Sequence, residues 1–285
     1  MNSIDTYRKQ KELFMSEYEK TVRQWMSDQK LNETVIKLIP FLEDGVVCPE
    51  TWFKEGNDFR PLFILKEASI GIDCKSELEA YYQKWKLTRF DHVGDEFGDI
   101  RIGVNKFKGN NPWMRIVKLA YGLKTAYETG LFCEYNTIVN TSYIEGKLNP
   151  DNVSGDSTYA HATANENYIS MVNRIAVVNI KKIAGGTYAK SELSKATLHY
   201  SKHLDKVLAD YLYKQIVEFI KPTVIVFCSP DISSVMKNAY GDKLIKQFIC
   251  LDGYHPSRTS TEKFYNHTVK EYIRNLGSVH ENLGR

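Results

Sequence analysis

Three polar side chains in this sequence are of types that catalyse hydrolysis, and each follows a short apolar run: Glu67, Asn179 and His255. A carboxylate can orient water or stabilise a developing cation, and an imidazole can donate a hydrogen bond to a departing anion. A carboxamide presents an acceptor and a donor, as needed to read one edge of a pyrimidine or an amide ligand. Together they suit the cleavage of a bond whose two fragments separate with opposite charges.

Each of the three residues also has an ordinary structural explanation. Glu67 could cap a helix or form an ion pair, and Asn179 could form an Asx turn. His255 taken alone fits a structural role equally well. No single residue therefore identifies a site, and the prediction depends on their joint placement at the ends of predicted strands.

Basic and hydroxyl side chains near these positions could bind an anion. Lys182 comes shortly after Asn179, and Ser257 and Arg258 come directly after His255 and Pro256. The segment from Ser257 leads into a predicted helix with a Thr-x-x-Glu capping box from position 259, and helix N-termini attract anions. The alternatives are an exposed lysine without a ligand and plain helix capping.

The apolar runs predict the sheet that would position these residues. They are short, rich in β-branched residues and without polar alternation, and they cover residues 61–65, 174–178, 223–228 and 247–251. Such runs are typical of parallel strands buried on both faces, and helical patterns lie between the later ones. We therefore predict an α/β fold, a three-layer α/β/α domain with a central four-stranded, mainly parallel sheet. Ligands of such sheets bind at the carboxyl ends of the strands.

The rest of the chain is predicted to decorate one domain over residues 1–285. Residues 1–45 form N-terminal helices, the first with its apolar face marked by Phe14, Tyr18, Val22 and Trp25. Residues from about 68 to 173 form an insert that serves as a pocket wall or lid. Within it, a helix begins at Pro112 and is expected to end at position 122.

Composition limits the class of protein. The 285 residues include 38 basic and 35 acidic side chains, so the net charge of +3 allows a polyanionic partner without requiring one. The five cysteines are scattered and include no C-x-x-C pair, which argues against a disulfide framework or a structural zinc site. No apolar run is long enough for a membrane helix, and the polar N-terminus is unlike a signal peptide. We expect a cytoplasmic protein with no membrane partner.

Four segments resemble, in order, the motifs of the uracil-DNA glycosylase superfamily: LKEAS, VVNIKK, KPTVIVFCS and YHPSRTS. The likeness is to the branch with a G-E-x-P-G first motif and a C-terminal HPS motif. It implies that Glu67 positions water or stabilises the sugar cation, that Asn179 recognises the base, and that His255 stabilises the leaving base. It also implies DNA as the partner.

The sequence departs from this family pattern in two places. The first motif lacks both glycines and the proline, with Lys66, Ala68 and Ser69 in their place, so the pocket floor and the target base are expected to differ. The branch with the greatest likeness carries an iron–sulfur cluster on four cysteines, but Ile183 stands at the place of one of them. We therefore predict no cluster, no metal and no other cofactor.

An extruded base also needs contacts outside the catalytic groups. Arg258 is the candidate for entering the duplex from the minor groove, and Ser257 for a contact to the bent backbone. A simple phosphate clamp is the alternative for Arg258. Trp113, at the start of the insert helix, is the candidate aromatic face for the base, and a core position is its alternative.

These observations predict a monofunctional DNA glycosylase that flips a pyrimidine nucleotide and leaves an abasic site, acting as a monomer. No lysine is obviously placed for Schiff-base chemistry, although Lys66 lies beside the candidate acid. The target is uracil or a modified, bulky pyrimidine such as those of viral DNA, in DNA repair or in defence against phage. The alternatives are a non-catalytic member that binds nucleic acid or a nucleotide, and an unrelated α/β hydrolase. The latter is disfavoured because G-x-S-x-G, P-loop and G-x-G-x-x-G motifs are absent in the required context.

Overall fold

A five-stranded mixed sheet forms the centre of the protein, with strand order β1-β4-β2-β6-β7. The strands are β1 (Gly45–Val46), β2 (Pro61–Leu65), β4 (Ala176–Asn179), β6 (Val224–Phe227) and β7 (Ile249–Asp252). Neighbours from β4 to β7 are parallel, and β1 is antiparallel to β4. The short strands β3 (Ser69–Ile70) and β5 (Gly185–Gly186) pair separately. The computed structural model describes residues 3–30, 33–38, 41, 44–65, 69–70, 112–135, 171, 173–182, 185–186, 205–241, 243–256 and 259–283.

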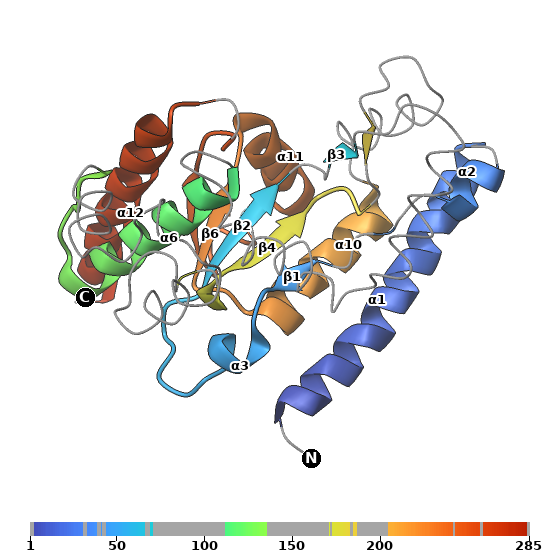
Figure 1. Cartoon of the computed structure of the whole chain (residues 1–285), viewed down its shortest axis with the longest axis horizontal. Coiled ribbons are helices and arrows are strands. Elements are labelled where there is room, and N and C mark those ends of the chain that lie inside the picture. The colour runs from blue at the N-terminus through green and yellow to red at the C-terminus, as the bar shows by residue number, and fades with distance from the viewer. Residues whose placement is uncertain are drawn as a thin grey trace, which may run out of the picture.

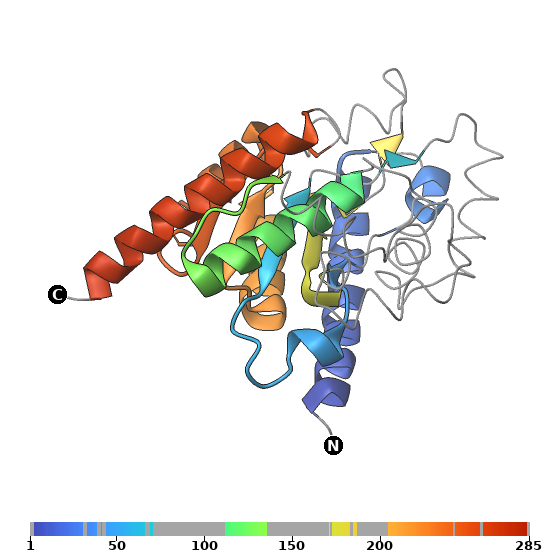
Figure 2. The same ribbon diagram turned by 60° about the vertical axis from the view of Figure 1, so that its left-hand side comes forward.

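Helices cover both faces of this sheet, which makes the fold α/β (Figures 1 and 2). α6 and α12 pack together on one face, and α10 and α11 lie on the other, with α1 outside α10. The helices are α1 (Ser3–Asp28), α2 (Glu33–Leu38), α3 (Pro49–Trp52), α6 (Pro112–Thr129), α10 (Lys206–Lys214), α11 (Pro230–Tyr240) and α12 (Thr261–Leu283). α10 continues directly into a π-helical segment, η3 (Gln215–Ile220).

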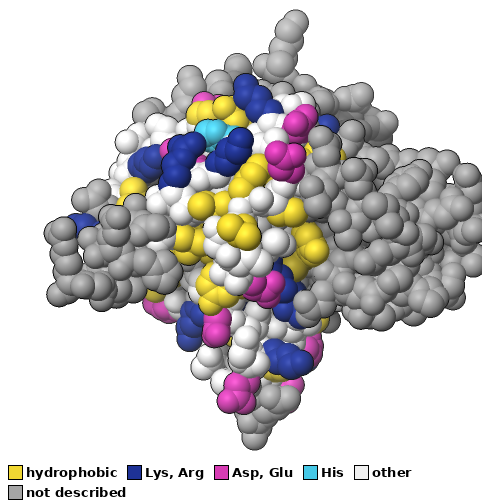
Figure 3. Space-filling model, turned by 90° about the vertical axis from the view of Figure 1, so that its left-hand side faces the viewer, with side chains coloured by type: hydrophobic (Ala, Val, Ile, Leu, Met, Phe, Trp, Pro, Cys, Tyr) yellow, Lys and Arg dark blue, Asp and Glu magenta, His cyan; other side chains and the backbone are white. Residues whose placement is uncertain are grey.

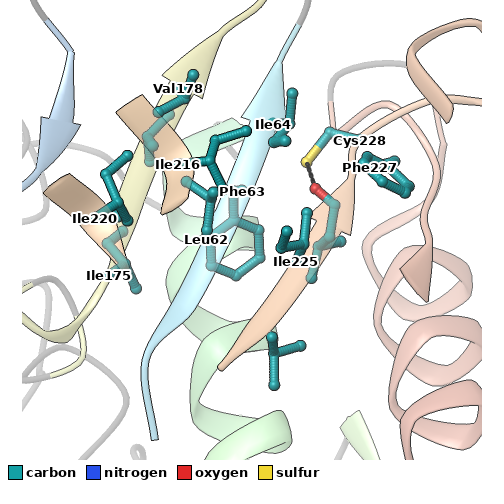
Figure 4. Close-up of a cluster of buried hydrophobic side chains, with 14 of the residues drawn as sticks. Leu62, Phe63, Ile64, Ile175, Val178, Ile216, Ile220, Ile225, Phe227 and Cys228 are labelled. Carbon is teal, nitrogen blue, oxygen red and sulfur yellow. Dashed lines mark hydrogen bonds between the residues drawn. The ribbon is translucent and has the colours of Figure 1, made fainter. Parts of the chain in front are cut away.

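The four predicted strands are confirmed, each with bounds that differ by no more than a few residues. Strands β2, β4 and β6 are buried on both faces, as uninterrupted apolar runs predict, whereas β7 at the edge of the sheet is only partly buried. Figure 4 shows Leu62 and Ile64 of β2 in the apolar core, with Ile220 of η3 beside Ile175. The central strand β2 is therefore enclosed by apolar side chains.

Strand β1 corrects the expectation of a four-stranded sheet. The sequence predicts that Gly45 ends a helix, but it pairs with Val177, and Val46 pairs with Ala176. A two-residue strand is too short to produce a periodic pattern, so sequence reasoning does not detect it. Its antiparallel pairing makes the sheet mixed.

The N-terminal helix packs as its apolar spacing predicts. Tyr18 and Val22 are fully buried, while Phe14 and Trp25 pack against the core from its margin. The Tyr18 ring stacks on Tyr211 of α10 with centroids 5.0 Å apart. This contact attaches α1 to the helical layer that covers the sheet. None of the described helices combines the length and apolar character needed to cross a bilayer.

Helix α6 does not end at Gly122, where the sequence predicts its end, but continues to Thr129. The glycine serves helix packing instead of helix termination. A Cβ at position 122 would overlap with the ring and hydroxyl group of Tyr265 in α12. Tyr265 is itself fully buried, and its hydroxyl donates to the carbonyl of Cys133 at 2.8 Å.

Gly122→Ala is expected to lower the free energy of unfolding by about 1–3 kcal/mol, because the added methyl group overpacks the α6–α12 contact. Urea unfolding measures the loss. The same substitution in a Tyr265→Leu background should cost much less, since the overlapping ring has been removed. Equal costs in the two backgrounds would contradict the packing explanation.

Candidate functional site

The sheet topology singles out one edge for a ligand. The chain leaves β2 for β4, its neighbour toward the β1 edge of the sheet, and leaves β6 for β7, its neighbour toward the opposite edge. The two connections therefore run in opposite directions from the gap between β2 and β6. In open α/β sheets, ligands bind outside the carboxyl ends of the strands at such a switch point. Leu65 ends β2 there, paired with Asn179 at the end of β4.

The structure places two of the three candidate catalytic residues at this edge. Asn179 is the last residue of β4 and is 8% exposed. His255 follows the end of β7 and is half-buried. Three strand spacings, or about 14 Å, separate β4 from β7, and β2 and β6 lie between these two strands. Glu67 comes two residues after β2 in the sequence and lies outside the described residues.

The remaining candidates are only partly described. Trp113 lies in the first turn of α6, and its side chain is outside the described part of the structure. Ser257 and Arg258 also lie outside the described residues. Their predicted contacts with a base or a DNA backbone therefore stay predictions.

Asn179 belongs to a buried polar cluster centred on Asp44. The Asp44 Oδ2 atom accepts from the backbone nitrogen of Asn179 at 2.6 Å and from its Nδ2 at 3.2 Å. The other carboxylate oxygen, Oδ1, accepts from Lys182 Nζ and, at 3.1 Å, from Gln215 Nε2. Gln215 Nε2 also donates to the Asp44 carbonyl at 3.0 Å. One carboxylate thereby joins the segment before β1, the end of β4 and the π-helical segment η3.

Lys182 does not lie where a phosphate contact would require it. Its side chain is 0% exposed, and its ammonium group forms an ion pair with Asp44, whose side chain is 8% exposed. Burial lowers the pKa of Lys182, and the neighbouring carboxylate opposes that shift. The structure therefore assigns Lys182 to the Asp44 cluster rather than to a DNA-facing surface.

Sequence reasoning missed Asp44 and Gln215, although a weak signal marks the first. Asp44 precedes Gly45, whose φ of +143° is a conformation that residues with a side chain rarely adopt. An Asp-Gly pair indicates a turn but not a partner 135 residues away. Gln215 gives no signal, because it lies within an ordinary helical pattern.

The loop that carries His255 is held by a residue from the insert helix. Arg115 of α6 donates from Nη1 to the carbonyl of Pro256 and, at 2.6 Å, to the carbonyl of Thr259. These carbonyls lie on either side of positions 257 and 258. The cap is at Ser260, whose Oγ accepts from Lys263 N at 3.3 Å, and not at position 259 with the predicted capping box, because the third residue after Ser260 is a lysine. Arg115 thus fixes the start of α12 relative to α6.

A pocket of about 480 Å³ adjoins the same loop. Asp252 lies on its wall and accepts from Ser233 Oγ at 2.5 Å and from Lys237 Nζ at 2.9 Å. Burial opposes ionisation of Asp252, but these hydrogen bonds lower its pKa overall. Figure 3, viewed from the α12 side, shows Lys and Arg side chains gathered around a histidine above an apolar area. The residues that line the pocket are Pro230, Ser233, Ser234, Lys237, Asn238, Asp252, Gly253, Tyr254 and His267.

Among the described residues, no group of His, Cys, Asp and Glu side chains has an arrangement that could hold a metal ion. The cysteines there are free thiols, and burial raises the pKa of Cys250 to about 12. Of the three candidate catalytic residues, the structure describes the carboxamide of Asn179 and the imidazole of His255.

No family model, curated protein or solved structure matches this chain. Assignment of a function must therefore depend on the residues at the carboxyl edge of the sheet and on their geometry.

Arg115→Met is expected to loosen the loop after β7. Two hydrogen bonds from a charged donor are lost, so the free energy of unfolding should fall by about 1–3 kcal/mol, with faster hydrogen exchange over residues 255–260. Arg8→Met is the matched control, because Arg8 pairs with Glu50 at an exposed site, and its cost should stay below about 1 kcal/mol. Unchanged exchange in the loop of Arg115→Met would argue against the anchoring role.

Asp44→Ala is expected to destabilise the protein by about 3–5 kcal/mol, because it leaves the Lys182 ammonium buried without its counter-charge. In the double variant Asp44→Ala, Lys182→Met the buried charge is gone, so a large part of that stability should return. Urea denaturation of both proteins tests this. If the double variant is less stable than the single one, the ion pair is not the source of the cost.

Proposed function

We propose that this protein is a monofunctional DNA glycosylase that hydrolyses the N-glycosidic bond of a flipped pyrimidine nucleotide. The proposal is supported by one observation above all: Asn179 and His255 lie at the carboxyl ends of β4 and β7, on either side of β2. The chain leaving β2 leads to Glu67 two residues later. A carboxamide, a carboxylate and an imidazole therefore follow strands of the same sheet edge.

These groups match the charges that develop during the reaction. Cleavage of the N-glycosidic bond leaves positive charge on the deoxyribose and negative charge on the base. Glu67, as a carboxylate, would stabilise the sugar cation or orient the attacking water, much as carboxylates do in sugar hydrolysis. His255 would donate a hydrogen bond to a carbonyl oxygen of the departing base. Water then supplies the hydroxyl of the abasic sugar and the proton taken up by the base.

Recognition of the base falls to Asn179 in this proposal. Its carboxamide can pair with a base edge that has both a donor and an acceptor. Because a base inside a duplex cannot reach the sheet edge, the nucleotide must leave the stack, which costs a few kcal/mol. The proposed substrate is uracil or a modified, bulky pyrimidine, since the first motif differs from the family pattern at Lys66, Ala68 and Ser69.

The polar surface next to the His255 loop is consistent with a nucleic-acid partner. Lys237, which pairs with Asp252, lines the pocket beside β7, and Lys263 Nζ lies 5.0 Å from the centre of the Tyr254 ring. Cations and an aromatic ring are the groups that contact phosphates and bases in nucleic acids. This surface supports DNA as the partner, with the loop after β7 closest to it.

The test is an excision assay with single-stranded and duplex oligonucleotides that contain uracil, 5-hydroxymethyluracil or a glucosylated pyrimidine, followed by alkali to cut abasic sites. We expect strand breaks with at least one substrate. Glu67→Gln and His255→Ala should each lower the single-turnover rate by about 10²–10⁴-fold while leaving DNA affinity nearly unchanged. Glu50→Gln, at an exposed carboxylate of α3 that pairs with Arg8, is the matched control for Glu67→Gln and should retain the full rate.

No strand break with any substrate would overturn the proposal. If the chain binds these oligonucleotides tightly yet never releases a base, the non-catalytic nucleic-acid-binding alternative replaces it. If His255→Ala retains the full rate, the imidazole has no part in catalysis and the assignment of the site is wrong.

A further inference from the structure

The two oxygens of the Asp44 carboxylate serve different partners. Oδ2 accepts from both the backbone nitrogen and the Nδ2 atom of Asn179. Oδ1 accepts from Lys182 Nζ and Gln215 Nε2. Lys182 and Gln215 thus bind one oxygen of the Asp44 carboxylate, and the other oxygen binds Asn179, the last residue of β4.

This arrangement determines how the Asn179 carboxamide is turned. An ionised carboxylate only accepts hydrogen bonds, so the end of the carboxamide that faces Oδ2 must be its nitrogen. The carbonyl oxygen Oδ1 of Asn179 is therefore at the opposite end of the group. A second bond, from the Asn179 backbone nitrogen at 2.6 Å, fixes the residue's main chain to the same oxygen.

The support behind Asp44 is itself buried. Lys182 is 0% exposed and Gln215 is 2% exposed. Gln215 begins the π-helical segment η3 and binds both the carboxylate and the main-chain carbonyl of Asp44. π-Helical segments are rare and are frequent at functional sites. The segment that contains Asp44 therefore has little freedom to move away from β4.

We propose that Asp44 is a positioning residue for the site: it sets the orientation of the Asn179 carboxamide, and Lys182 and Gln215 hold it in place. The inference deepens the proposed function, on which its consequence for base excision rests. A carboxamide rotated by 180° exchanges its acceptor and its donor, so a base edge that fits one orientation is mismatched to the other. Asp44 would thus contribute to specificity without touching the substrate.

Two double variants separate the hydrogen bond to Asn179 from the charge of the ion pair. Asp44→Asn with Lys182→Met removes both charges but keeps an acceptor for Asn179. Asp44→Leu with Lys182→Met also removes both charges and leaves no acceptor. Because neither protein retains an unpaired buried charge, both should fold. They differ in whether the side chain at position 44 offers an acceptor to Asn179 and Gln215, and Gln215 keeps its bond to the main-chain carbonyl of residue 44 in both.

The first measurement does not depend on activity. In full-length protein labelled with ¹⁵N-asparagine, the side-chain amide signals of Asn179 are identified by their loss in Asn179→Ser. Their hydrogen exchange should be at least about 10-fold faster in the Asp44→Leu double variant than in the wild type. In the Asp44→Asn double variant it should stay within about 3-fold of the wild type.

The second measurement is single-turnover excision of a substrate that the wild type cleaves. The Asp44→Leu double variant should lose about 10-fold or more in rate at saturating enzyme, because the base is held in a misaligned pose. The Asp44→Asn double variant should retain at least about a third of the rate. Tyr240→Phe controls for stability, since it removes a buried hydrogen bond from α11 to the Ala209 carbonyl of α10, outside the Asp44 cluster, and its rate should not change.

Equal amide exchange in the two double variants would overturn the positioning role. Equal excision rates in them would also overturn it, because orientation would then have no effect on the reaction. If the wild type excises no base at all, the proposed function fails, whereas the exchange comparison still decides whether Asp44 orients Asn179.

Discussion

One buried carboxylate ties three distant parts of the chain to the carboxyl edge of the sheet. Asp44 collects hydrogen bonds from the end of β4 and from η3, together with the Lys182 ion pair. A charged group in the protein interior is tolerated only when its hydrogen bonds and counter-charge are supplied. The segment before β1, strand β4 and helix α10 with η3 must therefore keep their relative places, and Asn179 acquires a fixed position from that requirement.

The other side of the edge is held in a different way. Arg115 binds main-chain carbonyls at positions 256 and 259, so a side chain from α6 holds the backbone of the segment after β7. Arg115 reaches that loop because α6 lies directly against α12, and the lack of a side chain at Gly122 permits this close approach. A packing contact in the helical layer thus supports the loop that carries His255.

Much of the architecture could be predicted from the sequence. The four parallel strands were recognisable because uninterrupted apolar runs are typical of strands buried on both faces, and Tyr18 and Val22 marked the buried face of α1. Strand β1 was missed because it has two residues, and the end of α6 was misplaced because a glycine that serves packing resembles one that ends a helix. Of the site, Asn179 and His255 were identifiable from their positions after strands.

The sequence by itself determined local properties: which segments are apolar enough to form the sheet, where they end, and which polar residues follow them. Only the tertiary structure decided which of those residues meet. Lys182 reads as an exposed cation beside Asn179, yet it is enclosed with Asp44, a partner 138 positions away. Arg115 binds Pro256 across 141 positions. Such pairings depend on how the strands are ordered in the sheet and how helices pack on it, which periodicity along the chain does not encode.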